Sequence, residues 1–308
     1  MRYVVASSVA SSHGEKPACG QWSDWPRDET LPMVTTVEGR DAKTDRPLIV
    51  VRYHHKRLRT QDTVLDGTLR HAMASLLSLK AAFDVKVPGV VRVDHWAYTD
   101  PRRLPPVRGQ PVGPENVNGG CTMGGGGEVI TCYRQEEYPK VWLHEAVHCF
   151  RLDFGAEAPT RALPIRTEKP VLVNEAWTEL LAEAFAVAFT TGANVGTRRW
   201  QAAWRLEVAH ALDASARLLR HNGYSRAEQL FDGSRTWRER TNVLAYYVLR
   251  AALMPRPDEW MAVTRFSELM ALLRQRLASP DFRTGLQRAL DAAPSNNVRS
   301  LRMMSSTK

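Results

Sequence analysis

The chain has 308 residues, of which 44% are hydrophobic and 24% charged, and this composition and length fit one large globular domain or two smaller ones. It contains no apolar run of the roughly 18 residues that a membrane span needs, and its first ten residues make a poor signal peptide, so we expect a soluble, intracellular protein, cytoplasmic or nuclear, with no membrane partner. The formal net charge of +9 favours acidic partners, but Lys and Arg are scattered, which favours solvated charge over a nucleic-acid-binding patch.

The four cysteines form neither a C-x-x-C pair nor a dense framework; they are Cys19, Cys121, Cys132 and Cys149. In an intracellular protein we therefore expect reduced thiols. Cys149 follows His148 directly, so on a helix it would point about 100° away from it and lie in the core.

The first half of the chain reads as strands with one long helix. Residues 1–30 show no periodicity and predict an irregular arm. Residues 33–37 and 48–53 are rich in β-branched side chains and predict a strand pair, and 90–98 alternate like a strand. From residue 62 to 83, apolar residues recur at helical spacing.

The second half reads as mainly helical. Residues 100–127 are rich in Pro and Gly, and because no Gly-Lys-Ser/Thr follows their four consecutive glycines, a flexible turn is favoured over a phosphate-binding loop. Residues 128–134 predict a short strand, and the helix after it should begin near 136–139, run to about Asp153 and stop at Gly155. Further helices are predicted over 173–192, 195–222, 238–254, 265–277 and 280–292, followed by a frayed tail over 303–308.

The motif with the clearest chemical meaning is His144-Glu145-x-x-His148, in an apolar, helix-compatible setting. Residues four apart share one face of a helix, so the two imidazoles can point at one place and hold one zinc ion. Glu145 can then serve as general base for a water. The alternative is a chance match, with both histidines on a solvated face.

A second segment can supply the third ligand that catalytic zinc needs. In the predicted helix over 173–192, Glu175 and Glu179 are four residues apart on the face opposite the apolar stripe. The alternative is a solvated pair of carboxylates on an amphipathic helix, but the preceding two-histidine motif favours the ligand interpretation.

The segment Asn174-Glu175-Ala176-Trp177-Thr178-Glu179 resembles the Asn-Glu-x-x-Ser-Asp segment of thermolysin-type gluzincins, with Thr-Glu in place of Ser-Asp. The resemblance implies that His144, His148 and Glu175 bind one zinc ion, and that Glu179 and Asn174 support the ligands, Glu179 through a free histidine N–H. The run from Arg134 to Val141 also resembles uncharacterised HExxH proteins of large DNA viruses, which implies no function.

The order of elements resembles the zincin core, which implies an α+β fold. We expect an irregular arm over 1–30, then over 31–154 a small mixed β-sheet with a backing helix and the active-site helix, and over 155–308 a mainly helical subdomain that supplies the third ligand. The edge strand of zincins binds an extended peptide, and 118–122, with Asn118 and Thr122 as substrate-binding residues, or 128–134 are the candidates here.

The resulting hypothesis is a zinc metallopeptidase in which Glu145 is the general base and Tyr246 stabilises the oxyanion. Tyr247, His210 and His221 are further candidates for the second role, and a packed core tyrosine is the alternative for either tyrosine. A protein or peptide substrate, an acidic one fitting the basic charge, is the expected partner. The alternatives are an inactive zincin-fold binding protein, a basic nucleic-acid-associated protein with an incidental motif, and a zinc hydrolase of non-peptide amides.

Overall fold

The computed structural model describes residues 3–11, 31–56, 62–86, 89–122, 129–155, 162–292 and 300–305. The chain divides into two compact units: unit 1 comprises 1–100 and 119–152, and unit 2 comprises 101–118 and 153–308. Residues 101–118 thus belong to unit 2 although residues of unit 1 both precede and follow them in the chain. No helix in these described ranges is long and apolar enough to cross a membrane.

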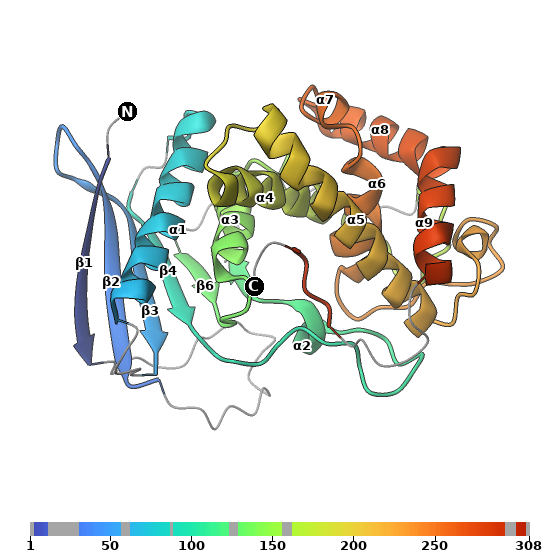
Figure 1. The fold of residues 1–308 in the computed structure, drawn as a ribbon, viewed down its shortest axis with the longest axis horizontal. Helices are drawn as coiled ribbons and strands as arrows, with labels where there is room; N and C mark the ends of the chain where they lie inside the picture. Colours follow the sequence, from blue (N-terminus) through green and yellow to red (C-terminus); the bar gives the residue numbers. More distant parts are fainter. Residues whose placement is uncertain are drawn as a thin grey trace. The chain divides into compact units, whose positions relative to one another are not determined.

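Unit 1 is built on a mixed sheet, as predicted (Figure 1). Its described strands, in the order β1-β2-β3-β4-β6-β5, are β1 (Tyr3–Ser11), β2 (Met33–Asp41), β3 (Pro47–His55), β4 (Val91–Trp96), β6 (Val129–Cys132) and β5 (Gly120–Thr122). The first three strands form an antiparallel meander, β4 runs parallel to both β3 and β6, and β5 is antiparallel to β6. Of the two candidate edge strands, β5 lies at the edge and β6 in the interior of the sheet.

Strand β1 corrects the prediction of an irregular arm, and residues 12–30 lie outside the described residues. All nine residues of β1 pair with β2, although serines and alanines give its sequence no clear alternation. Val4, for example, is half exposed. Backbone hydrogen bonds to β2 therefore make this segment a strand, although its sequence lacks an alternating hydrophobic pattern.

Helices α1 (Asp62–Ala82) and α3 (Tyr138–Cys149) cover the sheet in the described part of unit 1. Helix α1 connects β3 to the parallel strand β4 and packs on β1, β2 and β3, and helix α3 packs on α1, β5 and β6 (Figure 1). Fully buried Val37, Ile49 and Val93 form part of the core, and the alternate residues Arg52 and Asp94 form an ion pair of 2.5 Å. This is the period-two pattern of a sheet with one buried face.

Helix α3 ends earlier than predicted, at Cys149 rather than near Asp153. Arg151 takes a left-handed conformation with φ of 57°, and the N–H of Leu152 donates to the carbonyl of Val147. Glycine usually marks such an end, so Gly155 suggested the wrong place.

Unit 2 is helical in its described part. Its helices are α2 (Pro114–Val117), α4 (Asn174–Thr191), α5 (Arg198–His221), the 3-10 helix η1 (Ala227–Leu230), the π-helix η2 (Leu244–Leu249), α6 (Arg250–Leu253), α7 (Pro257–Trp260), α8 (Phe266–Ala278) and α9 (Pro280–Ala292). Helix α4 packs against α5, η2 and α6, and α9 packs against α5 and α8. An ion pair of 2.6 Å between Glu183 of α4 and Arg250 of α6 has no exposed side-chain surface.

Two predictions for unit 2 are wrong. The helix predicted over 238–254 begins only at Leu244 with a π-helix, because the carboxylate of Glu239 accepts from the N–H of Leu244 at 2.6 Å from outside the helix. The predicted frayed tail begins with two buried residues: Met303 and Met304 are at most 2% exposed, as is Leu301 just before them. Residues 306–308 lie outside the described residues.

The cysteines follow the prediction in part. Cys132 and Cys149 are buried thiols that form no disulfide, as expected of reduced thiols, and Cys149 lies in the core as predicted. Cys121 is disulfide-bonded, so the expectation of reduced thiols is wrong for this residue. The run of four glycines at 124–127 lies outside the described residues.

Candidate metal centre

Helix α3 presents the two histidines of the motif side by side. Their ring centroids lie 4.9 Å apart at an interplanar angle of 76°, and their Nε2 atoms are 3.2 Å apart. Two nitrogens that bind one tetrahedral zinc ion through bonds of about 2.0–2.1 Å lie about 3.4 Å apart. The pair is thus spaced as two ligands of one ion would be.

The motif does not lie on a solvated face, which was the alternative interpretation. His144 is 8% exposed, and every residue of α3 from Tyr138 to Val147 except Pro139 is buried. Trp142, fully buried, donates from its indole Nε1 to Nδ1 of His95 on β4 at 2.8 Å. Packing and this hydrogen bond therefore fix the helix two residues before the first histidine.

Glu145, between the histidines in sequence, contacts strand β5. The hydroxyl of Thr122 lies 2.8 Å from the Oε2 atom of Glu145 and 3.0 Å from its backbone carbonyl. A methyl group at Gly120 would lie 2.9 Å from Oε1 of Glu145 and 3.0 Å from the backbone oxygen of Thr131. The hydroxyl of Thr122 and the absence of a side chain at Gly120 thus shape the surroundings of the Glu145 carboxylate.

Glu175 occupies the first turn of α4, in unit 2. Its Oε1 atom accepts from Nδ2 of Asn242 at 3.4 Å, and Asn242 lies just before the π-helix η2. Asn174, one residue earlier, donates from its amide to the carboxylate of Asp153, also at 3.4 Å. Both Asn174 and Asp153 are buried.

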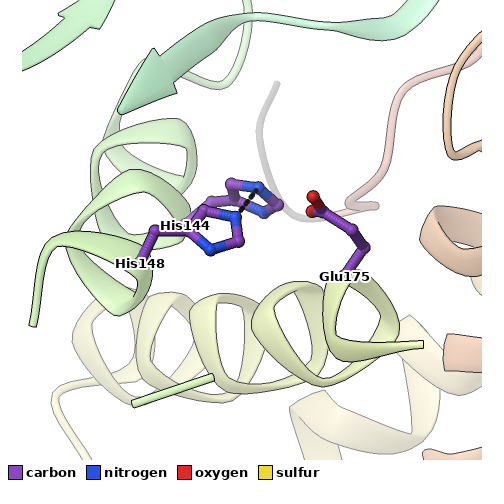
Figure 2. Close-up of side chains that lie close together, drawn as sticks. All are labelled: His144, His148 and Glu175. Atoms are coloured by element: carbon purple, nitrogen blue, oxygen red, sulfur yellow. Dashed lines mark hydrogen bonds between the residues drawn. The ribbon is translucent and has the colours of Figure 1, made fainter. Parts of the chain in front are cut away.

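His144, His148 and Glu175 form a group that could hold a metal ion. Each offers one ligand atom, and these atoms all lie within 4.8 Å of one another (Figure 2). His144 is buried, whereas the other two are half-buried, which leaves them accessible to a small ion. Figure 2 shows the carboxylate of Glu175 directed toward the paired imidazoles.

The donor set suits zinc. Two imidazole nitrogens and one carboxylate oxygen are a known ligand set of catalytic zinc, which keeps a fourth position for water or substrate. The residues present therefore fit the ion that the motif predicts. In the described part of the chain, no other group of His, Cys, Asp and Glu residues forms such a cluster.

Three other predicted site residues, Glu179, Tyr246 and Asn118, lie in different parts of the chain. Glu179 is buried on α4, one helical turn after Glu175. Tyr246 is buried in the π-helix η2, within the segment that the sequence predicts as a regular helix over 238–254. Asn118 lies before β5 rather than in it, and its Oδ1 accepts from the hydroxyl of Thr241 at 3.3 Å.

The remaining oxyanion candidates bind backbone carbonyls. Tyr247 donates to Leu301 at 2.6 Å, His210 to Arg302 at 2.9 Å, and His221 to Gln110 at 2.8 Å. Each of these contacts ties a helix or π-helix to a distant segment of unit 2. We therefore assign these three residues a structural role.

Sequence reasoning did not identify Asn242 or Gly120 as parts of the site. Asn242 occurs in an Arg-Thr-Asn-Val run with no recognisable motif, and its contact with Glu175 joins residues 67 positions apart. Gly120 follows another glycine in a Pro- and Gly-rich stretch, which resembles an ordinary turn.

No family model, curated protein or solved structure matches the chain.

Proposed function

We propose that the protein is a zinc-dependent metallopeptidase of gluzincin type, in which His144, His148 and Glu175 hold one zinc ion. The observation that carries the proposal is the grouping of these three ligand atoms within 4.8 Å, two of them from a His-Glu-x-x-His helix. Two motifs together support the assignment to the gluzincins: His144-Glu145-x-x-His148 and the segment from Asn174 to Glu179.

Bound zinc would supply Lewis acidity at this position, which lowers the pKa of a water and polarises a carbonyl. Glu145 takes the proton of the attacking water and delivers it to the nitrogen of the leaving amine, so the carboxylate is restored after each turnover. Burial of Glu145, which is 5% exposed, supports this role because it limits exchange of the proton with bulk solvent. Tyr246 is our candidate donor to the oxyanion.

An extended peptide is the substrate class that the sheet best accommodates. Strand β5 pairs with β6 on one side and is the last described strand of the sheet, so its other side can accept a further strand. Thr122, at the end of β5, contacts the proposed base directly. A peptide paired along β5 would therefore pass close to Glu145.

Two alternative functions explain the site less well. A binding protein that merely keeps the fold has no use for a buried carboxylate beside the first ligand, whereas a peptidase needs one. The densest basic runs of the sequence are 54–59 and 101–103, and residues 57–59 lie outside the described part of the chain. A nucleic-acid-binding role finds little support in the described residues of these runs, since His54, His55 and Arg102 are buried. The Nε of Arg102 donates to the carbonyl of Val117 at 2.7 Å.

The decisive experiment combines metal analysis with hydrolysis of an internally quenched peptide library. Purified protein should contain about one zinc per chain, and chelation should abolish hydrolysis that added zinc restores. Glu145→Gln should keep the zinc but lose hydrolysis by at least about a hundredfold. Absence of stoichiometric zinc, or full activity of Glu145→Gln, would contradict the proposal.

A further inference from the structure

We infer that the face of strand β5 formed by Gly120 and Thr122 positions the carboxylate of Glu145, so that Thr122 is a positioning residue for the proposed general base. This inference rests on the proposed function for its catalytic consequence, but the contact itself lies wholly within unit 1. It assigns Thr122 a role different from the substrate contact that the sequence suggested.

Strand alternation places the two positions on one face. Residues 120 and 122 are two apart on β5, and side chains two apart point to the same side of a sheet. Both positions meet Glu145: Thr122 through its hydroxyl, at 2.8 Å from Oε2, and Gly120 through the space beside Oε1. The two carboxylate oxygens thus each meet a different residue of the same strand.

The hydroxyl of Thr122 has two acceptors on Glu145. Its oxygen lies 2.8 Å from Oε2 of the carboxylate and 3.0 Å from the backbone carbonyl of the same residue. Because the hydroxyl has one hydrogen, it donates to one of these oxygens at a time. Both contacts hold Thr122 against the same residue of α3.

The lack of a side chain at Gly120 is a separate steric requirement. A Cβ there would lie 2.9 Å from Oε1 and 3.0 Å from Cγ of Glu145, and 3.0 Å from a backbone oxygen of Thr131 that cannot easily move. Alanine would consequently push the carboxylate away from the strand. Because a shift of about 1 Å in a reacting group can reduce catalysis a hundredfold, this placement has a functional consequence.

The test compares Thr122→Val, which removes the hydroxyl at nearly constant volume, with Thr122→Ser, which keeps it. Using the fastest cleaved peptide of the library, we expect kcat of Thr122→Val to fall about 10- to 100-fold, with KM and zinc content unchanged. Thr122→Ser should restore most of kcat, and Gly120→Ala should lower kcat with zinc retained. An unchanged kcat in Thr122→Val, or a change in KM alone, would overturn the inference.

A second measurement does not depend on peptidase activity. In urea unfolding, the midpoint shifts of Thr122→Val and Glu145→Ala should not add in the double variant, because the two residues contact each other. The control pair Thr190→Val and Glu145→Ala should add, since the hydroxyl of Thr190 binds the backbone of Ala186 in unit 2. Additive shifts in the first pair would overturn the inference, whereas non-additive shifts without hydrolysis would refute only the proposed function.

Discussion

The indole of Trp142 donates a hydrogen bond of 2.8 Å to Nδ1 of His95, and this contact joins the helix that carries the two proposed histidine ligands to the central strand β4. The imidazole is fully buried among the rings of Tyr53, Tyr138 and Trp142. An accepting Nδ1 requires the neutral tautomer that is protonated at Nε2. A buried, neutral histidine therefore supports the orientation of α3.

This arrangement predicts acid sensitivity. Burial lowers the pKa of His95 from 6.5 to about 3. Its contribution to stability is complete above pH 6.5 and is lost as the pH falls toward 3, because the unfolded chain then binds a proton that the folded chain does not. His95→Asn, whose Oδ1 can accept the same hydrogen bond, should show a weaker loss of stability across this window. Urea unfolding at a series of pH values measures the free energy of unfolding of the wild type and the variant. Parallel plots of this free energy against pH would contradict the prediction.

Removal of the third ligand should weaken metal binding strongly. Glu175→Ala leaves two imidazoles, so we expect zinc affinity to fall by more than about a hundredfold, since loss of even an outer supporting partner costs 10- to 100-fold. Competition with a chromogenic chelator measures this affinity. Glu228→Ala is the matched control, because Glu228 forms a surface ion pair with Arg283. Equal affinities would place the third ligand elsewhere.

Replacement of Asn242 should lower the zinc affinity less than replacement of Glu175 does. Its amide donates to Oε1 of Glu175, and loss of a partner that orients a ligand carboxylate lowers metal affinity by roughly tenfold. Asn242→Ala should therefore weaken zinc binding while the stoichiometry stays near one. Asn222→Ala, which removes an amide bonded to the carbonyl of Leu218, should leave the affinity unchanged. A wild-type affinity in Asn242→Ala would show that the long contact of 3.4 Å carries no function.

The two adjacent tyrosines should differ in what their loss affects. Tyr246→Phe should lower kcat about a hundredfold, because it removes the proposed donor to the oxyanion. Tyr247→Phe should instead destabilise unit 2 by about 1–3 kcal/mol, because it leaves the buried carbonyl of Leu301 without its donor. Thermal unfolding and peptide hydrolysis, measured on both variants, separate these effects. The reverse pattern would exchange the assigned roles.

The sequence predicted the local parts of the candidate site well and the tertiary contacts poorly. His144, His148 and Glu175 could be found because helical periodicity and a known ligand set constrain their spacing. The contact between Thr122 and Glu145 could not, because it depends on how β5 packs against α3, 23 residues away in sequence.

In the fold too, elements with a local sequence pattern could be predicted, whereas elements that depend on tertiary contacts could not. Long periodic helices such as α4 and α9 begin and end close to their predicted bounds. Strand β1, the left-handed turn at Arg151 and the π-helix η2 have no such pattern. They arise from strand pairing, from a strained backbone without glycine and from a side-chain cap by Glu239, each of which only the folded chain supplies.

The buried segment at 300–305 has a consequence for how the chain folds during synthesis. Leu301, Met303 and Met304 fill the interior of unit 2, and Ser305 donates to the carboxylate of Glu207 from both its N–H and its hydroxyl. Unit 2 therefore cannot complete its core until this segment has left the ribosome. Helix α4, which carries Glu175, is made more than a hundred residues earlier and must wait for it. All residues of unit 1 precede residue 153, so they are synthesised before α4, and Glu175 reaches its final surroundings only after translation has passed residue 305.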